Sequence, residues 1–235
     1  MHIPDGFINA GTSVGAGVAA AGGIGVCLRR TAEALEERLA PMAGLVAAFV
    51  FAVQMLNFPV ASGTSGHLLG GVLAAVLVGP WAGAVCVAVV LMIQALLFAD
   101  GGLTALGLNV VNMALVTAFG GYGVFLLLRR VLPRTRAGIA TASGVAATIG
   151  VVLASLAFVV EYAIGGTGDV SIGTVAGAMV GVHVLIGIGE GVITAITVSA
   201  VLAVRPDLVH GASELTPTLD RRDRVPIHAS LEEPA

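Results

Sequence analysis

The sequence predicts an all-α polytopic membrane protein, a helical bundle of seven transmembrane helices. Of its 235 residues, 57% are hydrophobic and only 11% are charged, and the mean hydropathy is +1.01. A soluble domain normally carries about 25% charged residues. Apolar runs long enough to cross the hydrocarbon layer recur along the chain. These observations disfavour a soluble enzyme, and the lack of a basic patch argues against nucleic acid as a partner.

The apolar runs define the expected spans. They cover residues 7–28, 41–58, 67–78, 81–99, 103–128, 137–163 and 172–204. A spanning helix needs about 20 residues, and all the runs but one come close to this length or exceed it. The run at 67–78 has only twelve residues. As a helix it would cover about 18 Å, which is also typical of a half-span.

The arginines resolve whether the short run crosses. All eleven basic residues are arginines, and they fall in three groups, residues 29–38, 129–136 and 205–224. Cytoplasmic loops collect Lys and Arg near the ends of spans. Only seven crossings place all three groups in the cytoplasm, with the N-terminus outside and the C-terminus inside. We therefore expect one transmembrane domain at residues 1–204, followed at 205–235 by a polar, disordered cytoplasmic tail.

The first two residues form a candidate metal chelate. Methionine before a bulky residue such as His2 is normally retained, so we expect a free amine on Met1. This amine, the His2 backbone nitrogen and the His2 Nδ1 atom can close two fused chelate rings around one ion. A fourth imidazole would complete a square-planar set of nitrogens, which Ni(II) and Cu(II) favour and Co(II) accepts.

The topology selects the fourth nitrogen. His67 stands at the outer end of its short run, on the same side as Met1, and is the preferred candidate. His183 lies deeper in the last span and is the second choice. Glu190 follows His183 by seven residues and shares its face of that helix. His183 and Glu190 are also candidates for packing helices together or for contacting a partner subunit.

The sequence resembles the CbiM/NikM family, the substrate-specific membrane components of energy-coupling-factor (ECF) transporters for cobalt and nickel. The resemblance rests on five segments: MHIPDGF at 1–7, QMLNFPVASGTSGHLLGG at 54–71, GPWAG at 79–83, IQALLFADGGLTALGLNVVNMA at 93–114 and HVLIGIGEG at 183–191. Together they extend over most of the apolar part of the chain.

The resemblance implies a function, a location and partners. The chain would capture Co²⁺ or Ni²⁺, with a slight preference for Co²⁺, as an ABC-type importer subunit in the plasma membrane of a prokaryote. Cobalt so acquired serves cobalamin biosynthesis. The expected partners are a transmembrane coupling subunit and two cytoplasmic ATPases, with a small accessory membrane subunit as a further candidate. The chain itself would be no enzyme and would need no cofactor besides the transported ion.

The resemblance also implies the ligands. The metal would be held by Met1, His2 and His67, and the loop at 58–66 would close over it. Ligating histidines generally need neighbours that orient them and exclude water. The residues that we expect in this role are Asn57, Ser65, Gln94, Phe98 and Asn112.

A different class of protein offers the alternative interpretation. Gly63-Thr64-Ser65-Gly66 fits the GxSG pattern of intramembrane serine proteases of the rhomboid kind. His183 on a later span would then be the base that activates Ser65. The pattern has only four residues in a chain with 33 glycines, so it is weak evidence.

Overall fold

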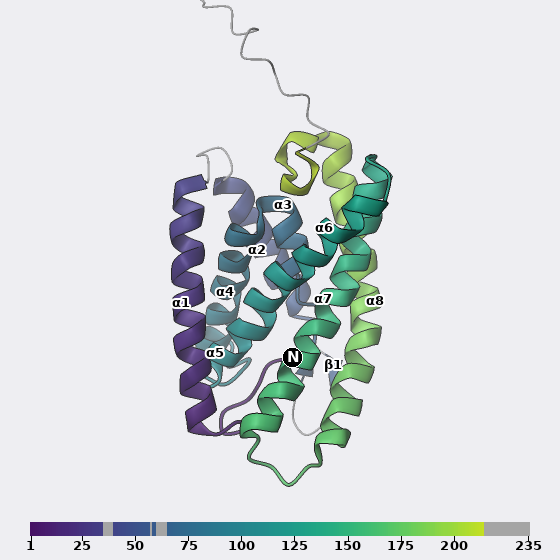
Figure 1. Ribbon diagram of the computed structural model, residues 1–235. Helices are drawn as coiled ribbons and strands as arrows, with labels where there is room; N and C mark the ends of the chain where they lie inside the picture. The colour runs from purple at the N-terminus through teal and green to yellow at the C-terminus, as the bar shows by residue number, and fades with distance from the viewer. Residues whose placement is uncertain (35–39, 57, 60–64, 214–235) are drawn as a thin grey trace, which may run out of the picture.

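The computed structural model is a bundle of helices and describes residues 1–34, 40–56, 58–59 and 65–213 (Figure 1). Its elements, in chain order, are α1 (Ala10–Ala34), α2 (Ala40–Gln54), β1 (Phe58–Pro59), β2 (Ser65–Gly66), α3 (Gly71–Val78), α4 (Pro80–Leu97), α5 (Leu106–Asn109), the π-helical η2 (Val110–Gly121), α6 (Tyr122–Val131), α7 (Arg136–Gly165), α8 (Ile172–Val204) and the 3₁₀ turns η3 (Pro206–Leu208) and η4 (His210–Ala212). The predicted helical fold is confirmed.

The outer surface of the bundle suits a lipid environment. Within the described residues, five helices are long and apolar enough to cross a membrane, with α5, η2 and α6 forming one of them, and α2 is a shorter apolar helix. Large apolar side chains point outward from these helices. Val18 is 70% exposed, Leu185 70% and Ile196 64%. In water such surfaces would be costly, whereas in hydrocarbon they are the expected covering.

Glycines let the two longest helices lie close together. A Cβ atom on Gly144 of α7 would lie 2.8 Å from the carbonyl oxygen of Gly191 on α8. Thr148 on α7 also donates a hydrogen bond to the carbonyl oxygen of Gly187, at 2.9 Å. Small residues and interhelical hydrogen bonds are the usual means by which helices associate in lipid.

The short apolar run is only partly helical. Helix α3 begins at Gly71, and all eight of its residues are buried. Residues 67–70 before it are buried but not helical, and Gly70 turns the chain with a φ of 74°. Because non-helical chain can rise further per residue than a helix, residues 67–78 can cover more than the roughly 18 Å of a continuous helix. In Figure 1 the segment accordingly leads from the end of the bundle near β1 towards the opposite end.

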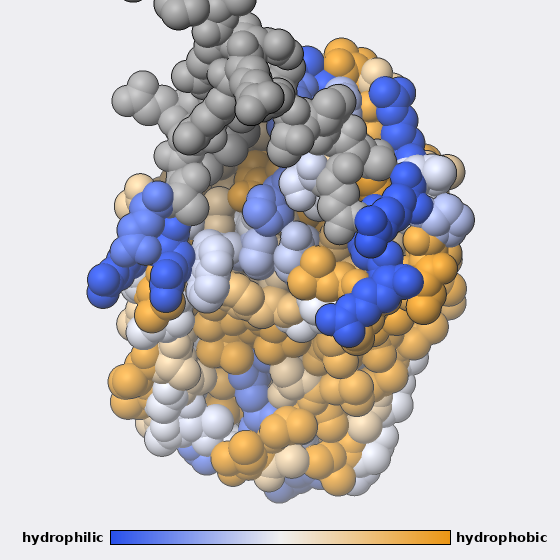
Figure 2. All heavy atoms as spheres, turned by 45° about the horizontal axis from the view of Figure 1, so that its top comes forward, coloured by the Kyte–Doolittle hydropathy of each residue, from blue (hydrophilic) through white to orange (hydrophobic). Residues whose placement is uncertain are grey.

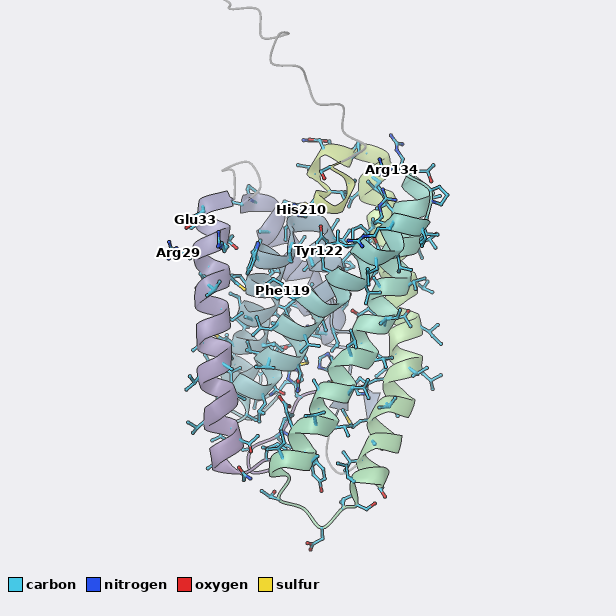
Figure 3. All side chains as sticks on the ribbon, in the orientation of Figure 1. Arg29, Glu33, Phe119, Tyr122, Arg134 and His210 are labelled. Atoms are coloured by element: carbon cyan, nitrogen blue, oxygen red, sulfur yellow. The ribbon has the colours of Figure 1, made fainter. Side chains whose placement is uncertain are left out.

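The arginines lie at one end of the bundle. Arg29 and Arg134 occupy the same end in Figure 3, and α6 and α8 also end there. The other described arginines are close to these positions in the chain: Arg30 on α1, Arg129 and Arg130 in the last turn of α6, Arg136 at the start of α7 and Arg205 directly after α8. Figure 2 shows hydrophilic side chains gathered around this end and a hydrophobic surface beyond it. The number of seven crossings and the side of the membrane that this end faces both stay predictions.

The folded part of the chain extends beyond the predicted boundary at residue 204. Val209 and Ala212, on the turns after α8, are buried with 2% and 0% exposure. The ring of His210 packs 6.0 Å from that of Tyr122 (Figure 3). The expected disordered tail therefore begins too early at residue 205, because this segment covers the arginine-rich end of the bundle. Residues 214–235 lie outside the described part.

The topology can be tested with single cysteines. In a background with Cys27 and Cys86 replaced by Ala, we expect Asp169→Cys to react with a membrane-impermeant maleimide in intact cells. Arg134→Cys should react only after the membrane is opened, because the two exposed positions lie at opposite ends of the bundle. Labelling of both cysteines in intact cells would contradict seven crossings.

Candidate metal centre

The N-terminal segment enters the bundle instead of extending into solvent. Residues 1–7 are not helical, and the chain end lies between the helices in Figure 1. Met1 and Ile3 are completely buried, and His2 is 4% exposed. A buried chain end needs partners for its backbone N–H and C=O groups, because water does not reach them.

Helix α5 and the loop that precedes it supply some of these partners. The Ile3 N–H donates to Oδ1 of Asn109, the last residue of α5, at 2.8 Å, and Asn109 Nδ2 donates back to the Ile3 carbonyl at 3.3 Å. The same carbonyl accepts the N–H of Gly102, in the loop between α4 and α5, at 2.9 Å. Further along, the Asp5 carboxylate accepts the backbone N–H and the hydroxyl of Thr104, at 2.8 and 2.5 Å. The segment is thus hydrogen-bonded along its length although it belongs to no helix.

The loop between α7 and α8 holds the segment from another side. The Thr167 hydroxyl donates to the Gly6 carbonyl at 2.6 Å. The Phe7 ring packs against Phe158 and Tyr162 on α7, with centroids 5.8 and 5.3 Å away. The contacts of Asp5 and Phe7 explain the acid and the aromatic residue of the opening heptapeptide, and the φ of 77° at Gly6 explains the glycine.

The imidazoles of His2 and His67 stack on each other inside the bundle. Their centroids are 4.5 Å apart and their planes differ by 30°. His67 is completely buried, and its Nδ1 lies 2.7 Å from the Leu68 carbonyl oxygen. Since a carbonyl can only accept, Nδ1 carries the proton and Nε2 keeps its lone pair. That Nε2 has no hydrogen-bond partner among the described residues, as a metal ligand requires.

The Met1 amine and the His2 imidazole carry no positive charge at neutral pH. Burial lowers the pKa of the Met1 amine from 8.0 to about 4, although the negative charge of Asp100 opposes this shift. Burial also lowers the pKa of His2 from 6.5 to about 3, helped by the neighbouring Met1 amine. Both groups therefore keep lone pairs available for a cation.

Glu190 holds the backbone that carries His67. Its two carboxylate oxygens accept the N–H groups of Leu69 and Gly70, at 2.5 and 3.0 Å. From α2, Gln54 Nε2 donates to the Leu69 carbonyl at 2.7 Å. Both polar side chains are buried. The chain after His67 is thus held from α8 and from α2. This role of Glu190 is more specific than the helix packing or subunit contact expected from the sequence.

His183 remains the second candidate for the fourth nitrogen. It is completely buried, and its Nδ1 is 2.7 Å from the Met179 carbonyl oxygen. Its Nε2 has no hydrogen-bond partner in the described part of the chain. It is also close enough to the Met1 amine and to His67 to interact with them electrostatically. The stacked ring of His67 has the more direct contact with His2.

The residues expected around the ligands occupy different surroundings. Gln94 is completely buried, and neither of its side-chain polar atoms has a partner among the described residues. Asn112 is also buried, but it donates to Glu161 at 2.6 Å. Phe98 is 53% exposed and packs against Phe51. Gln94 thus stays the strongest of these three proposals.

Two of the expected residues cannot be compared with the structure. Asn57 lies outside the described residues, and so does most of the loop at 58–66 that was expected to close over the metal. Ser65 belongs to β2, whose residues Ser65 and Gly66 pair with Pro59 and Phe58 of β1, but the surroundings of its side chain are not described. Their roles stay predictions.

Sequence reasoning missed several residues that position the chain end. Asn109 was visible as a polar residue within a span, but its pairing with Ile3 joins positions 106 residues apart. Gly101 has a φ of 95°, and a Cβ atom there would lie 2.9 Å from His2 Nδ1. Asp100 Oδ2 lies 3.5 Å from His2 Nε2. Glycines and an acid in an external loop are common, so only the fold makes them informative.

Comparison with known proteins identifies the family. The sequence model of the CbiM family, described as the cobalt uptake substrate-specific transmembrane region, matches residues 2–208. The chain belongs to this family. Among the described residues, no three His, Cys, Asp or Glu side chains form a metal-binding group.

Individual relatives agree with this membership. The chain is 40% identical over 209 residues to a putative fused nickel transport protein NikMN of Archaeoglobus fulgidus, covering 89% of this chain and 68% of the relative. It is 39% identical to a putative metal transport protein of Haloquadratum walsbyi, covering 89% and 93%. A crystal structure of a transition metal transporter has a TM-score of 0.80 and 31% identity, covering 87% and 93%.

These relatives bear on the two interpretations of the sequence. They confirm the CbiM/NikM resemblance and the membrane character of the chain. The intramembrane protease interpretation, with Ser65 as nucleophile and His183 as base, finds no support in them. The names of the relatives describe transport and not catalysis.

Replacing Glu190 tests whether it positions His67. In Glu190→Gln, one acceptor oxygen becomes an NH₂ group that faces a backbone N–H, so one hydrogen bond is lost. We expect the free energy of unfolding to fall by about 1–3 kcal/mol and Ni²⁺ affinity to fall about tenfold or more, because the His67 segment loosens. Thermal unfolding in detergent and calorimetric titration measure the two effects.

Glu161→Gln is the matched control. Glu161 is on α7 and accepts a hydrogen bond from Asn112, which a glutamine oxygen can still accept. We expect its Ni²⁺ affinity to stay unchanged. An equal loss of affinity in both variants would contradict a specific role for Glu190.

Proposed function

We propose that this chain is the substrate-capture subunit of an ECF-type importer, which takes Co²⁺ or Ni²⁺ from outside into a square-planar site of four nitrogens. The observation that carries the proposal is the buried chain end, with His2 stacked on a histidine whose Nε2 is unpartnered. Membership of the CbiM family supports the same assignment.

The proposed site uses two residues for three ligands. The Met1 amine, the His2 backbone nitrogen and His2 Nδ1 bind one ion in fused five- and six-membered rings. The His2 amide must lose its proton to do so. His67 Nε2 supplies the fourth nitrogen. The hydrogen bonds of Ile3 to Asn109 hold the backbone directly after this chelate, so its atoms need little rearrangement when the ion arrives.

Transport requires partners in this proposal. A transmembrane coupling subunit and two cytoplasmic ATPases would drive release of the ion into the cell of a prokaryote, and a small accessory membrane subunit is a further candidate. The relative from Archaeoglobus is named a fused nickel transport protein, which supports an assembly of several parts. The arginine-rich end of this chain would face the cytoplasm, where the ATPases act.

The choice between the two ions depends on geometry and supply. Four nitrogens in a plane suit Ni(II) well and are accepted by Co(II). The family description names cobalt and the Archaeoglobus relative is named for nickel. A slight preference for Co²⁺ stays the prediction from the sequence, and a competition titration with both ions on the purified protein measures it.

An N-terminal extension tests the chelate. We expect one glycine placed before Met1 to abolish tight binding of Ni²⁺ and Co²⁺, because the amine becomes an amide and the buried chain end has no room for another residue. Calorimetric titration of the purified protein measures binding, and circular dichroism checks that the helices form.

A cleavable extension is the control. If a protease site is placed so that cleavage regenerates Met1 as the first residue, cleavage should restore binding to the same sample. Full binding by the extended protein before cleavage would contradict the proposed site.

The two buried histidines can be distinguished by substitution. We expect His67→Ala to remove one of the four ligands and to abolish the visible absorption of the planar Ni²⁺ complex. His183→Ala should retain that absorption, because His183 is only near the site. The reverse result, loss in His183→Ala alone, would show that His183 is the fourth ligand.

A further inference from the structure

A cavity of about 380 Å³ lies against the candidate metal centre. Its lining includes His2, Asp5 and Asp100, together with the backbone of Gly101 and Gly102. It is therefore formed where the N-terminal segment meets the loop between α4 and α5. The chain before α5 lies towards the end of the bundle opposite Arg29 and Arg134 (Figures 1 and 3).

His2 connects this cavity with the buried nitrogens. Met1 and His67 are completely buried, whereas the His2 ring both stacks on His67 and lines the cavity. His2 Nε2 has no hydrogen bond within the described residues, although only 4% of the side chain is exposed; Asp100 Oδ2 lies 3.5 Å from it. A buried polar atom without a hydrogen bond next to a cavity is expected where another group binds.

Gly101 leaves the path to the chelate open. A Cβ atom at this position would lie 2.9 Å from His2 Nδ1 and 3.1 Å from Asn109 Nδ2. Any side chain would thus fill the space between the cavity wall and the His2 atom that we assign to the metal. With glycine, the backbone borders the cavity and the space beside Nδ1 stays available.

The charge of the cavity suits a hydrated cation. Asp5 and Asp100 both line it, whereas Arg29 and Arg134 lie at the other end of the bundle (Figure 3). The Asp5 carboxylate is committed to Thr104 by two hydrogen bonds. Asp100 is nearer to the chelate, since its Oδ2 lies 3.5 Å from His2 Nε2. Carboxylates in a cleft with low-dielectric walls focus the field and raise the local cation concentration.

We propose that this cavity is the entrance to the metal centre, and that the Asp100 carboxylate receives the hydrated divalent cation before the nitrogens bind it. The proposal rests on the proposed function, because the nitrogens of Met1, His2 and His67 are the destination. The ion arrives with its water shell, exchanges water for a carboxylate oxygen of Asp100, and then passes along Gly101 to His2 Nδ1. Asp100 therefore determines how fast the ion binds rather than how tightly it is held.

The rate of Ni²⁺ association tests this role. In stopped-flow experiments on the detergent-purified protein at low ionic strength, with absorption of the bound Ni²⁺ as the signal, we expect Asp100→Asn to slow association about tenfold. Its dissociation rate should match that of the unaltered protein. Raising the ionic strength should slow association in the unaltered protein much more than in Asp100→Asn, because salt screens the carboxylate.

Two variants serve as controls. Asp100→Glu keeps the charge at the same position and should restore most of the association rate. Asp169→Asn removes one charge from an exposed loop at the same end of the bundle but outside the cavity lining, and should bind at the normal rate. Slow association in Asp169→Asn to the same extent would mean that only the overall charge of this face matters, and would overturn the proposal.

A cysteine variant keeps the test valid if Asp100→Asn does not fold. Asp100→Cys, without Cys27 and Cys86, can be modified after folding with a thiosulfonate reagent that carries either a sulfonate or a trimethylammonium group. The sulfonate should support faster Ni²⁺ association than the ammonium group. Equal rates would overturn the proposal.

The kinetic outcomes separate this proposal from the proposed function. Normal association with faster dissociation in Asp100→Asn would show that Asp100 only holds the His2 ring, and would overturn the entrance while leaving the chelate intact. Absence of Ni²⁺ binding by the unaltered protein with a native N-terminus would instead contradict the chelate itself, and the entrance with it.

Discussion

The reciprocal hydrogen bonds between Asn109 and the backbone of Ile3 are the interaction on which the candidate centre depends. A chain end inside a helical bundle has N–H and C=O groups that no helix of its own satisfies, and each unsatisfied group costs several kcal/mol in hydrocarbon. Asn109 satisfies both backbone groups of Ile3, because its side-chain amide both donates and accepts hydrogen bonds. The α-amine is only two residues away from this attachment, so its position follows directly from it.

Because the chain end itself is the proposed chelate, the rest of the bundle has few ligands to position. Three of the four proposed nitrogens belong to consecutive residues, so covalent geometry sets their spacing and the bundle needs to position only one more. His67 has that position because the chain that follows it is bound to Glu190 on α8 and to Gln54 on α2. Residues 67–70 are not helical, and their free backbone groups are what Glu190 and Gln54 bind. Non-helical backbone at membrane depth is tolerated only when protein buries it in this way.

The sequence predicted the long helices well because the length of each apolar run determines where such a helix begins and ends. The run at 172–204 coincides with α8, and the run at 137–163 differs from α7 by one or two residues. The prediction was less accurate where tertiary contacts override composition. Gly70 delays the start of α3, and the packing of Val209 and Ala212 extends the fold past residue 204.

The candidate ligands Met1, His2 and His67 could be proposed from the sequence because chelate geometry and topology are local arguments. The residues that hold these candidate ligands in place could not be proposed from the sequence. Glu190 contacts Leu69 across 121 residues of sequence, and Asn109 contacts Ile3 across 106. No periodicity or spacing links such positions, and a carboxylate in a span is equally compatible with helix packing or a proton relay. Only the folded chain shows that both side chains bind backbone close to a candidate ligand.

Charge balance explains why a divalent ion suits this place. A cation without compensation is very costly in a low-dielectric interior. In the proposed complex the deprotonated His2 amide contributes one negative charge, whereas the amine and imidazoles are neutral ligands. A doubly charged ion then keeps one net positive charge in the buried site, and a trivalent ion would keep two. The proposed ligand set thus favours a divalent metal that accepts a planar geometry, and the Asp100 carboxylate, 3.5 Å from the His2 ring, acts on the approach of the ion.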